Sequence, residues 1–232
     1  MRGNITSVTE VRDIFIADLV LIVAFSLTIT GGIAAFSGGG AAKAVGTFEY
    51  YLPIAALAVS LSFILHELMH KFIAQRYGAS AEFRTSFSGL AITLVTGAFG
   101  FLLGIPGATM IYTNRFTNRE DGIVSIAGPL TNLAVFLVFL VLLLAASPAP
   151  GSYLFNAINF TIFISLLLAF FNMLPIFPLD GSKVLRWDRR VYAAFMLVLL
   201  GLIIIFNVLT ILEVLIMIGI ALVFSFIYRF TL

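Results

Sequence analysis

The sequence predicts an all-α polytopic membrane protein. Of its 232 residues, 61% are hydrophobic and only 10% are charged, and apolar runs of about 20 residues, the length that a helix needs to cross a bilayer, recur along the chain. Eleven acidic and thirteen basic side chains are too few to cover a soluble domain of this size. An unusually apolar soluble domain is the alternative, and we expect lipid to surround most of the chain.

Composition also limits the partners and the chemistry. The net charge is +2, but no basic stripe with interleaved aromatic residues is present, so no nucleic-acid partner is expected. The chain has no cysteine, which excludes disulfides and thiolate ligands. A bound metal ion would therefore need nitrogen and oxygen ligands.

The first half of the chain contains two expected spans. An apolar run from Ile14 to Phe36 is interrupted only by Asp18. Because a cleaved signal peptide has a shorter apolar region and a small-residue cleavage site, we interpret this run as a retained anchor. The glycine-rich stretch Ser37 to Gly40 predicts a turn, and a second span is expected from about Tyr50 to Ile73.

The second half contains the remaining spans. The third runs from about Gly122 to Ala146 and ends in a proline-rich loop, and the fourth runs from Tyr153 to about Pro175. The last apolar stretch before Arg229 is too long for one crossing at about 1.5 Å per residue. Two short crossings hinged between Asn207 and Glu213 fit better, which brings the total to about six transmembrane helices.

The segment from Thr85 to Asn114 is apolar and uncharged, but it is rich in glycine and broken by Pro106. If it does not cross the membrane, Lys43 is the only basic residue outside and all others are cytoplasmic. If it crosses, Arg115 and Arg119 move outside together with the cluster from Lys183 to Arg190, and the charge bias largely disappears. We therefore predict a re-entrant or β-like segment, with both termini cytoplasmic.

The second span carries the sequence His66-Glu67-Leu68-Met69-His70, and its two histidines are the only ones in the chain. Residues four apart lie on one face of a helix, so both imidazoles can reach one ion. Zinc bound by two histidines and a third ligand, with Glu67 as general base, is the arrangement of HExxH proteases. The alternative is that neighbouring helices satisfy these groups without a metal.

The third ligand must be acidic, and Asp180 is the best candidate. It follows a stretch in which Pro175 and Pro178 break the fourth helix. His66 lies roughly 7 Å before the basic end of its span, and Asp180 lies just before Lys183, so the two are expected at a similar depth on the same side. Alternatively, Asp180 pairs with Lys183 or Arg186 at a helix end.

Three motifs in order resemble the site-2 protease family of intramembrane zinc metalloproteases: the histidine motif, Ala127 to Asn132, and the run Asn172 to Gly181. The resemblance covers about Leu52 to Arg190. It implies an intramembrane endopeptidase with one Zn²⁺ per chain, for which His66, His70 and Asp180 are the ligands and Glu67 is the general base.

The resemblance also implies a role for Asn172, and the sequence differs from the family pattern at one position. Asn172 is expected to orient the substrate or to stabilise the oxyanion, with a helix–helix hydrogen bond as the alternative. Met69 stands where the family usually has glycine. Gly128-Pro129 and Asn132 are expected to open the third span, either as a helix start with proline in its first turn or with a role in packing the site.

We expect residues 1–232 to form a single integral membrane metalloprotease domain, with a catalytic core at about 50–190 and no room for a PDZ or CBS domain. Its substrates would be single-pass membrane proteins that are already trimmed or unfolded, and its active site would face the cytoplasmic side of the cell membrane. The segment Thr85 to Asn114 would offer them a strand edge. The oligomeric state remains open.

Three alternatives remain at this point. A transporter or channel for a metal ion also has intramembrane histidine and acidic residues, but it normally has several sites along a path. A catalytically inactive relative that binds membrane partners is the second alternative, and the intact Glu67 argues against it. The third concerns the metal, because two histidines and an aspartate also bind iron or cobalt.

Overall fold

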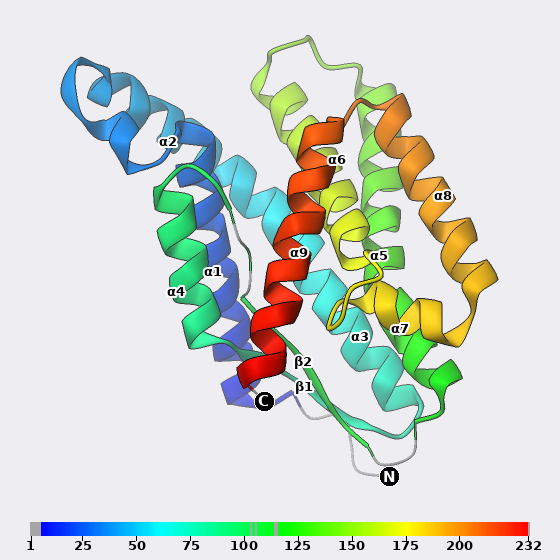
Figure 1. The fold of residues 1–232 in the computed structure, drawn as a ribbon. Helices are drawn as coiled ribbons and strands as arrows, with labels where there is room; N and C mark the ends of the chain where they lie inside the picture. Colours follow the sequence, from blue (N-terminus) through cyan, green and yellow to red (C-terminus); the bar gives the residue numbers. More distant parts are fainter. Residues whose placement is uncertain (1–5, 103, 105, 114–115, 232) are drawn as a thin grey trace.

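The computed structural model describes residues 6–102, 104, 106–113 and 116–231, and most of them are helical (Figure 1). Among the described residues, four helical segments are long and apolar enough to cross a membrane, which confirms the predicted fold class. They are α1 (Val8–Thr30), the continuous stretch Gly38–Arg76, α5 (Asn118–Ala146) and α6 (Tyr153–Asn172).

The second span contains a break in its helical pattern. It consists of α2 (Ala41–Val59), a π-helical turn (Ser60–Ile64) and α3 (Leu65–Arg76). The two histidines follow the π turn directly. Such turns widen the helix by one residue and change the direction in which the following side chains point, and they are common at functional sites.

Side chains of the π turn bind two neighbouring spans. Ser60 Oγ donates to Asp18 Oδ2 of α1 at 2.7 Å, and Ser62 Oγ lies 2.8 Å from Ser165 Oγ of α6. Asp18, the one acidic residue in the first predicted span, therefore contributes to helix–helix contact.

The segment predicted to be re-entrant begins and ends at the same end of the molecule (Figure 1). Strands β1 (Ser80–Thr85) and β2 (Gly107–Tyr112) pair in antiparallel fashion, with α4 (Phe87–Ala98) between them. A helix of 12 residues is about 18 Å long, well short of the roughly 30 Å hydrocarbon core. The β-like character is confirmed at Thr85, the last residue of β1, and in β2, and the described residues between them include the helix α4. That the segment returns without crossing the membrane stays a prediction. Its last residue, Asn114, and Arg115 lie outside the described residues.

The start of α5 corrects one prediction. Thr117 and Glu120 form a capping box that starts this helix at Asn118. Gly128, Pro129 and Asn132 therefore do not open the span but lie in its interior. The capping sequence Thr-x-x-Glu was a stronger start signal than the proline, because a membrane helix tolerates an internal proline when its neighbours satisfy the freed backbone groups.

Three further helices complete the chain: α7 (Asp180–Trp187), α8 (Arg189–Ile205) and α9 (Ile211–Thr231). The chain turns between α8 and α9 at Asn207, whose φ of +48° is left-handed, a conformation that asparagine adopts more readily than most residues. The predicted hinge in the last apolar stretch is confirmed.

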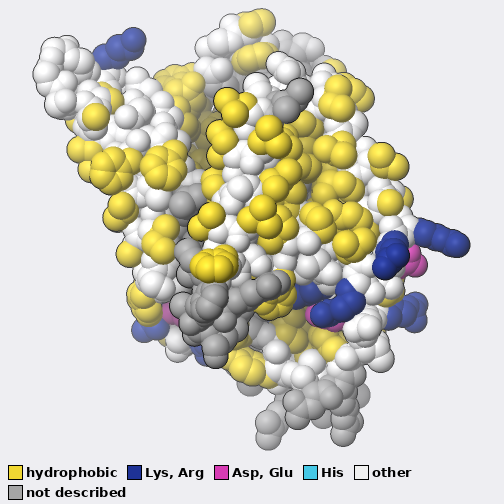
Figure 2. Space-filling model, in the orientation of Figure 1, with side chains coloured by type: hydrophobic (Ala, Val, Ile, Leu, Met, Phe, Trp, Pro, Cys, Tyr) yellow, Lys and Arg dark blue, Asp and Glu magenta, His cyan; other side chains and the backbone are white. Residues whose placement is uncertain are grey.

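The surface separates into an apolar band and a polar end. In Figure 2 hydrophobic side chains cover most of the upper part of the face shown. Apart from one basic group at the upper left, basic and acidic side chains gather below, toward the end that carries α7 and the sheet. Large apolar side chains on α5 and α8 are well exposed, for example Leu144 at 69% and Ile204 at 76%. Such a surface suits lipid and is unusual for a soluble protein.

A buried ion pair joins α1 to α3. Lys71 Nζ lies 2.5 Å from Glu10 Oε2, with 2% and 0% of the two side chains exposed. The other oxygen of Glu10 accepts from the backbone N–H of Phe83 in β1 at 3.1 Å. The first turn of α1, the helix α3 and the sheet are therefore held together at one point.

We predict that the Lys71→Met variant unfolds more readily than the double variant Glu10→Gln/Lys71→Met. The single change leaves a buried carboxylate unpaired, at a cost of about 3–5 kcal/mol, whereas Gln in the double variant is neutral and still accepts from Phe83. Thermal unfolding in detergent measures the difference. A double variant no more stable than Lys71→Met would contradict a role for charge pairing.

Candidate metal centre

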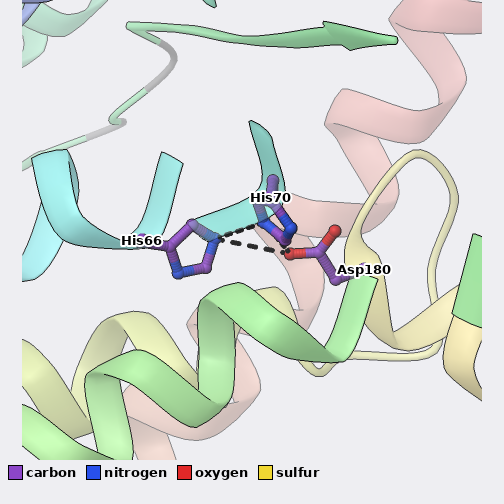
Figure 3. Close-up of side chains that lie close together, drawn as sticks. All are labelled: His66, His70 and Asp180. Carbon is purple, nitrogen blue, oxygen red and sulfur yellow. Dashed lines mark hydrogen bonds and ion pairs between the residues drawn. The ribbon is translucent and has the colours of Figure 1, made fainter. Parts of the chain in front are cut away.

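The structure brings His66, His70 and Asp180 together, as the sequence analysis predicted (Figure 3). His66 Nε2 and His70 Nε2 lie 3.0 Å apart, and Asp180 Oδ2 lies 3.4 Å and 3.1 Å from them. Both histidines are buried, and only 12% of the Asp180 side chain is exposed. Two imidazole nitrogens and one carboxylate oxygen thus converge on one point.

Asp180 reaches the histidines because of the turn after α6. It is the first residue of α7, and the following Gly181 lets this helix start directly beneath the end of α6. A β-carbon at Gly181 would collide with the backbone carbonyl groups of Met173 and Leu174. Arg186, one alternative partner of Asp180, instead pairs with Asp121 of α5 at 2.5 Å.

One face of α5 holds both imidazole rings. His70 Nδ1 lies 2.8 Å from the carbonyl oxygen of Val124, and His66 Nδ1 lies 3.1 Å from the Asn132 amide. Val124, Gly128 and Asn132 are four residues apart and share this face. Val124 was not among the predicted site residues. For Gly128 and Asn132, a role in packing the site was the alternative to a helix start, and their contacts with the histidines agree with that alternative. The four-residue spacing around a glycine was the available signal.

The arrangement fits one metal ion. A β-carbon built on Gly128 would lie 2.5 Å from Nε2 of both histidines, so the glycine leaves room where the two nitrogens point. Both Nδ1 atoms have partners on α5, so each Nε2 is directed toward Asp180. Nitrogen and carboxylate donors without thiolate are a ligand set typical of catalytic zinc.

Strand β2 holds Glu67. Glu67 Oε2 accepts from the backbone N–H of Thr109 at 2.9 Å and lies 2.9 Å from its hydroxyl. Nothing in the sequence indicated this contact, because it depends on the pairing of strands that lie more than twenty residues apart. The segment between the motifs therefore contributes directly to the site.

Asn172 is the last residue of α6, and its Nδ2 donates to the carbonyl oxygen of Leu168 in the same helix at 3.0 Å. The structure does not bring its side chain into the cluster of His66, His70 and Asp180. Its expected role toward substrate stays a prediction.

Known proteins with similar sequences match the part of the chain that contains these motifs. The model of peptidase family M50 matches residues 145–195, which include the turn that carries Asp180. A protein of Methanocaldococcus jannaschii, whose name describes it as a zinc metalloprotease, is 44% identical over 149 residues, covering 64% of this chain and 77% of the relative.

Two bacterial relatives carry similar names. One from Bacillus subtilis is 32% identical over 166 residues, with 60% of this chain and 72% of the relative covered. One from Mycobacterium tuberculosis is 28% identical over 178 residues, with 71% and 68% covered. The family match, the extent of these similarities and the apolar helices together establish that the chain is an integral membrane protein that belongs to peptidase family M50, the site-2 protease family.

Proposed function

We propose that the protein is a zinc-dependent endopeptidase that hydrolyses peptide bonds within or near the transmembrane segments of membrane proteins. The observation that carries the proposal is the buried cluster of His66, His70 and Asp180, which lies beside Glu67 in the interior of an apolar helical bundle. Such a cluster is costly inside a membrane and is a functional site by default.

His66, His70 and Asp180 would hold one Zn²⁺ in this proposal. Their donor atoms match zinc, and the relatives are named zinc metalloproteases. When bound, zinc supplies Lewis-acid activation of water and of the scissile carbonyl group.

Glu67 would act as the general base. Its carboxylate takes a proton from the attacking water and then delivers a proton to the nitrogen of the leaving amine. Thr109 holds Oε2, which fixes the carboxylate against β2 and limits the rotamers that it can adopt. One of the two groups that hold Oε2 is the backbone N–H of Thr109. The position of β2 therefore influences the position of the base.

The outer edge of β2 would receive the substrate. Phe83, the register partner of Thr109, directs its N–H to Glu10, and Thr109 directs its N–H to Glu67. The two N–H groups therefore point out of the sheet on opposite sides. An extended segment pairing with β2 would lie beside the base, whereas a helix would hide its peptide bonds. Trimmed or partly unfolded single-pass proteins fit this requirement.

Asn172 would assist only after a change of rotamer, because its amide donates to Leu168 in the substrate-free protein. We propose that substrate binding releases this bond and lets the amide orient the peptide or stabilise the oxyanion.

The protein would lie in the cell membrane, with its active site facing the cytoplasm. Helices α8 and α9 would add two membrane crossings. The charge distribution supports this orientation. Lys43 lies at the start of α2, at the opposite end of the molecule from α7 and the sheet (Figure 1). Basic residues near the proposed cytoplasmic end are Arg12, Arg76, Arg84, Lys183 and Arg186.

A metal-ion transporter is the main rival from another class. It would need further sites along a path, but across the described residues His66, His70 and Asp180 form the single group of potential metal ligands. An inactive relative would not need Glu67, whose carboxylate is present and held in place.

We predict that Glu67→Gln lowers peptide cleavage by about 10²–10⁴-fold, the usual contribution of a general base, while the bound metal is retained. Glutamine keeps an acceptor for Thr109 but cannot take up a proton. The assay compares wild type, variant and chelator-treated wild type on labelled single-pass membrane substrates in detergent, with zinc quantified. Cleavage by Glu67→Gln at the wild-type rate would contradict the assignment of the base.

We also predict that Gly128→Ala loses most of its bound zinc, since the added methyl group would lie 2.5 Å from Nε2 of both histidines. Gly201→Ala in α8 is the matched control, because nothing lies within 4 Å of the β-carbon position there. Metal per chain is measured by mass spectrometry after purification. One zinc per chain in both variants would rule out this location for the metal.

A photo-cross-linking amino acid at Met110 of β2 is expected to capture a single-pass substrate, because this side chain is 45% exposed and lies next to Thr109. The same probe at Val141, 63% exposed on α5, is the control for random contact in the detergent micelle. Equal capture at the two positions would argue against binding along β2.

A further inference from the structure

Asn132 is a buried polar side chain for which the proposed mechanism has no use. It lies in the middle of α5 with 0% of its surface exposed. Its Nδ2 lies 3.1 Å from His66 Nδ1, and its Oδ1 has no hydrogen-bond partner in the part of the chain that the structure describes. An amide in an apolar interior is costly unless it is hydrogen-bonded.

The direction of the His66 ring decides what Asn132 must do. His66 Nε2 faces His70 Nε2 at 3.0 Å and Asp180 Oδ2 at 3.4 Å. A metal ion held there leaves the ring proton on Nδ1, which then acts as a donor. Nδ2 of the amide is also a donor, so these two atoms cannot remain facing each other.

Rotation of the amide by half a turn resolves this conflict. The nitrogen and oxygen of an asparagine side chain are nearly identical in shape, so their assignment follows from the hydrogen bonds that they make. With the amide turned, Oδ1 accepts from His66 Nδ1–H, and the oxygen that had no partner gains one.

The second histidine provides an internal comparison. The Val124 carbonyl oxygen is 2.8 Å from His70 Nδ1 and can only accept. Two turns farther along the same face of α5, the Asn132 oxygen would do the same for His66. One ring is thus held by the backbone and the other by a side chain, so only the second support can be removed by mutation.

We propose that Asn132 is a positioning residue whose side-chain oxygen accepts the Nδ1 proton of His66, selects Nε2 as the metal-binding atom and slows the loss of the metal. The inference rests on the proposed ligand set of His66, His70 and Asp180. It adds a role that needs no substrate: Asn132 sets how long the protein keeps its metal.

The test compares Asn132→Leu, which has a similar size and no acceptor, with Asn132→Asp, which can only accept. Zinc-loaded protein in detergent is mixed with a chromophoric chelator, and the rate of zinc release is recorded. Asn132→Leu should release zinc about 10- to 100-fold faster than wild type, whereas Asn132→Asp should stay close to wild type. Asn159→Leu in α6, where the amide binds Phe155 of its own helix, controls for loss of an amide in the bundle.

A second measurement reads the ring nitrogens directly. Because His66 and His70 are the only histidines, ¹⁵N-histidine labelling reports on these two rings alone. The zinc-loaded wild type should show both rings protonated at Nδ1, and Asn132→Leu should change the signals of one ring and leave the other unchanged. Stripped of zinc, each variant is also compared by thermal unfolding, so that misfolding is recognised.

Three outcomes would overturn the proposal. Asn132→Asp releasing zinc as fast as Asn132→Leu would show that the amide donor is required, and wild-type release from Asn132→Leu would show that the contact is unimportant. Absence of zinc from the wild-type protein and from every variant would reject the ligand set itself, which separates failure of the proposed function from failure of this inference.

Discussion

The structure depends on one constraint: polar groups inside an apolar bundle need partners within the protein. The cluster of His66, His70 and Asp180 meets this constraint through α5, where a backbone carbonyl and an amide flank the two rings and Gly128 leaves space between them. A larger residue at Gly128 would push the rings apart, and an apolar residue at Asn132 would leave one ring nitrogen without a partner. The long helix α5 is therefore as much a part of the site as the helix that carries the histidines.

The same constraint explains the position of the two-stranded sheet. Backbone N–H groups that point away from a sheet need acceptors when they are buried, and here the outward N–H groups of Phe83 and Thr109 donate to Glu10 and Glu67. Lys71, one turn after Glu67, neutralises Glu10. Helix α3 thus contacts the β2 edge directly through Glu67 and the β1 edge through the pair of Lys71 with Glu10 of α1. The proposed base and the buried ion pair therefore belong to one connection between the sheet and the site.

The sequence was most informative where a physical signal was local. The spacing of His66 and His70 on a helix, the prolines before Asp180 and the apolar runs each predicted a feature that the structure contains. The interior position of Pro129 was missed because a proline after glycine resembles a helix start, while the stronger capping signal at Thr117 lies twelve residues earlier. The contacts of Thr109 and Val124 were inaccessible, since each depends on how segments far apart in sequence pack together.

The proposed charge distribution and the cluster of metal ligands place the same requirement on the membrane topology. The proposal that the basic residues share a side requires residues 85–114 to return without crossing, and the pairing of Ser80–Thr85 with Gly107–Tyr112 supports it by bringing these two strands together. The meeting of Asp180 with the histidines requires the same parity of crossings, because an added crossing between them would place the carboxylate at the wrong end of the bundle. A glycine-rich segment with strand ends and a short helix meets both requirements. An apolar segment of that length would otherwise favour a straight span, and its glycines and Pro106 disfavour one continuous helix.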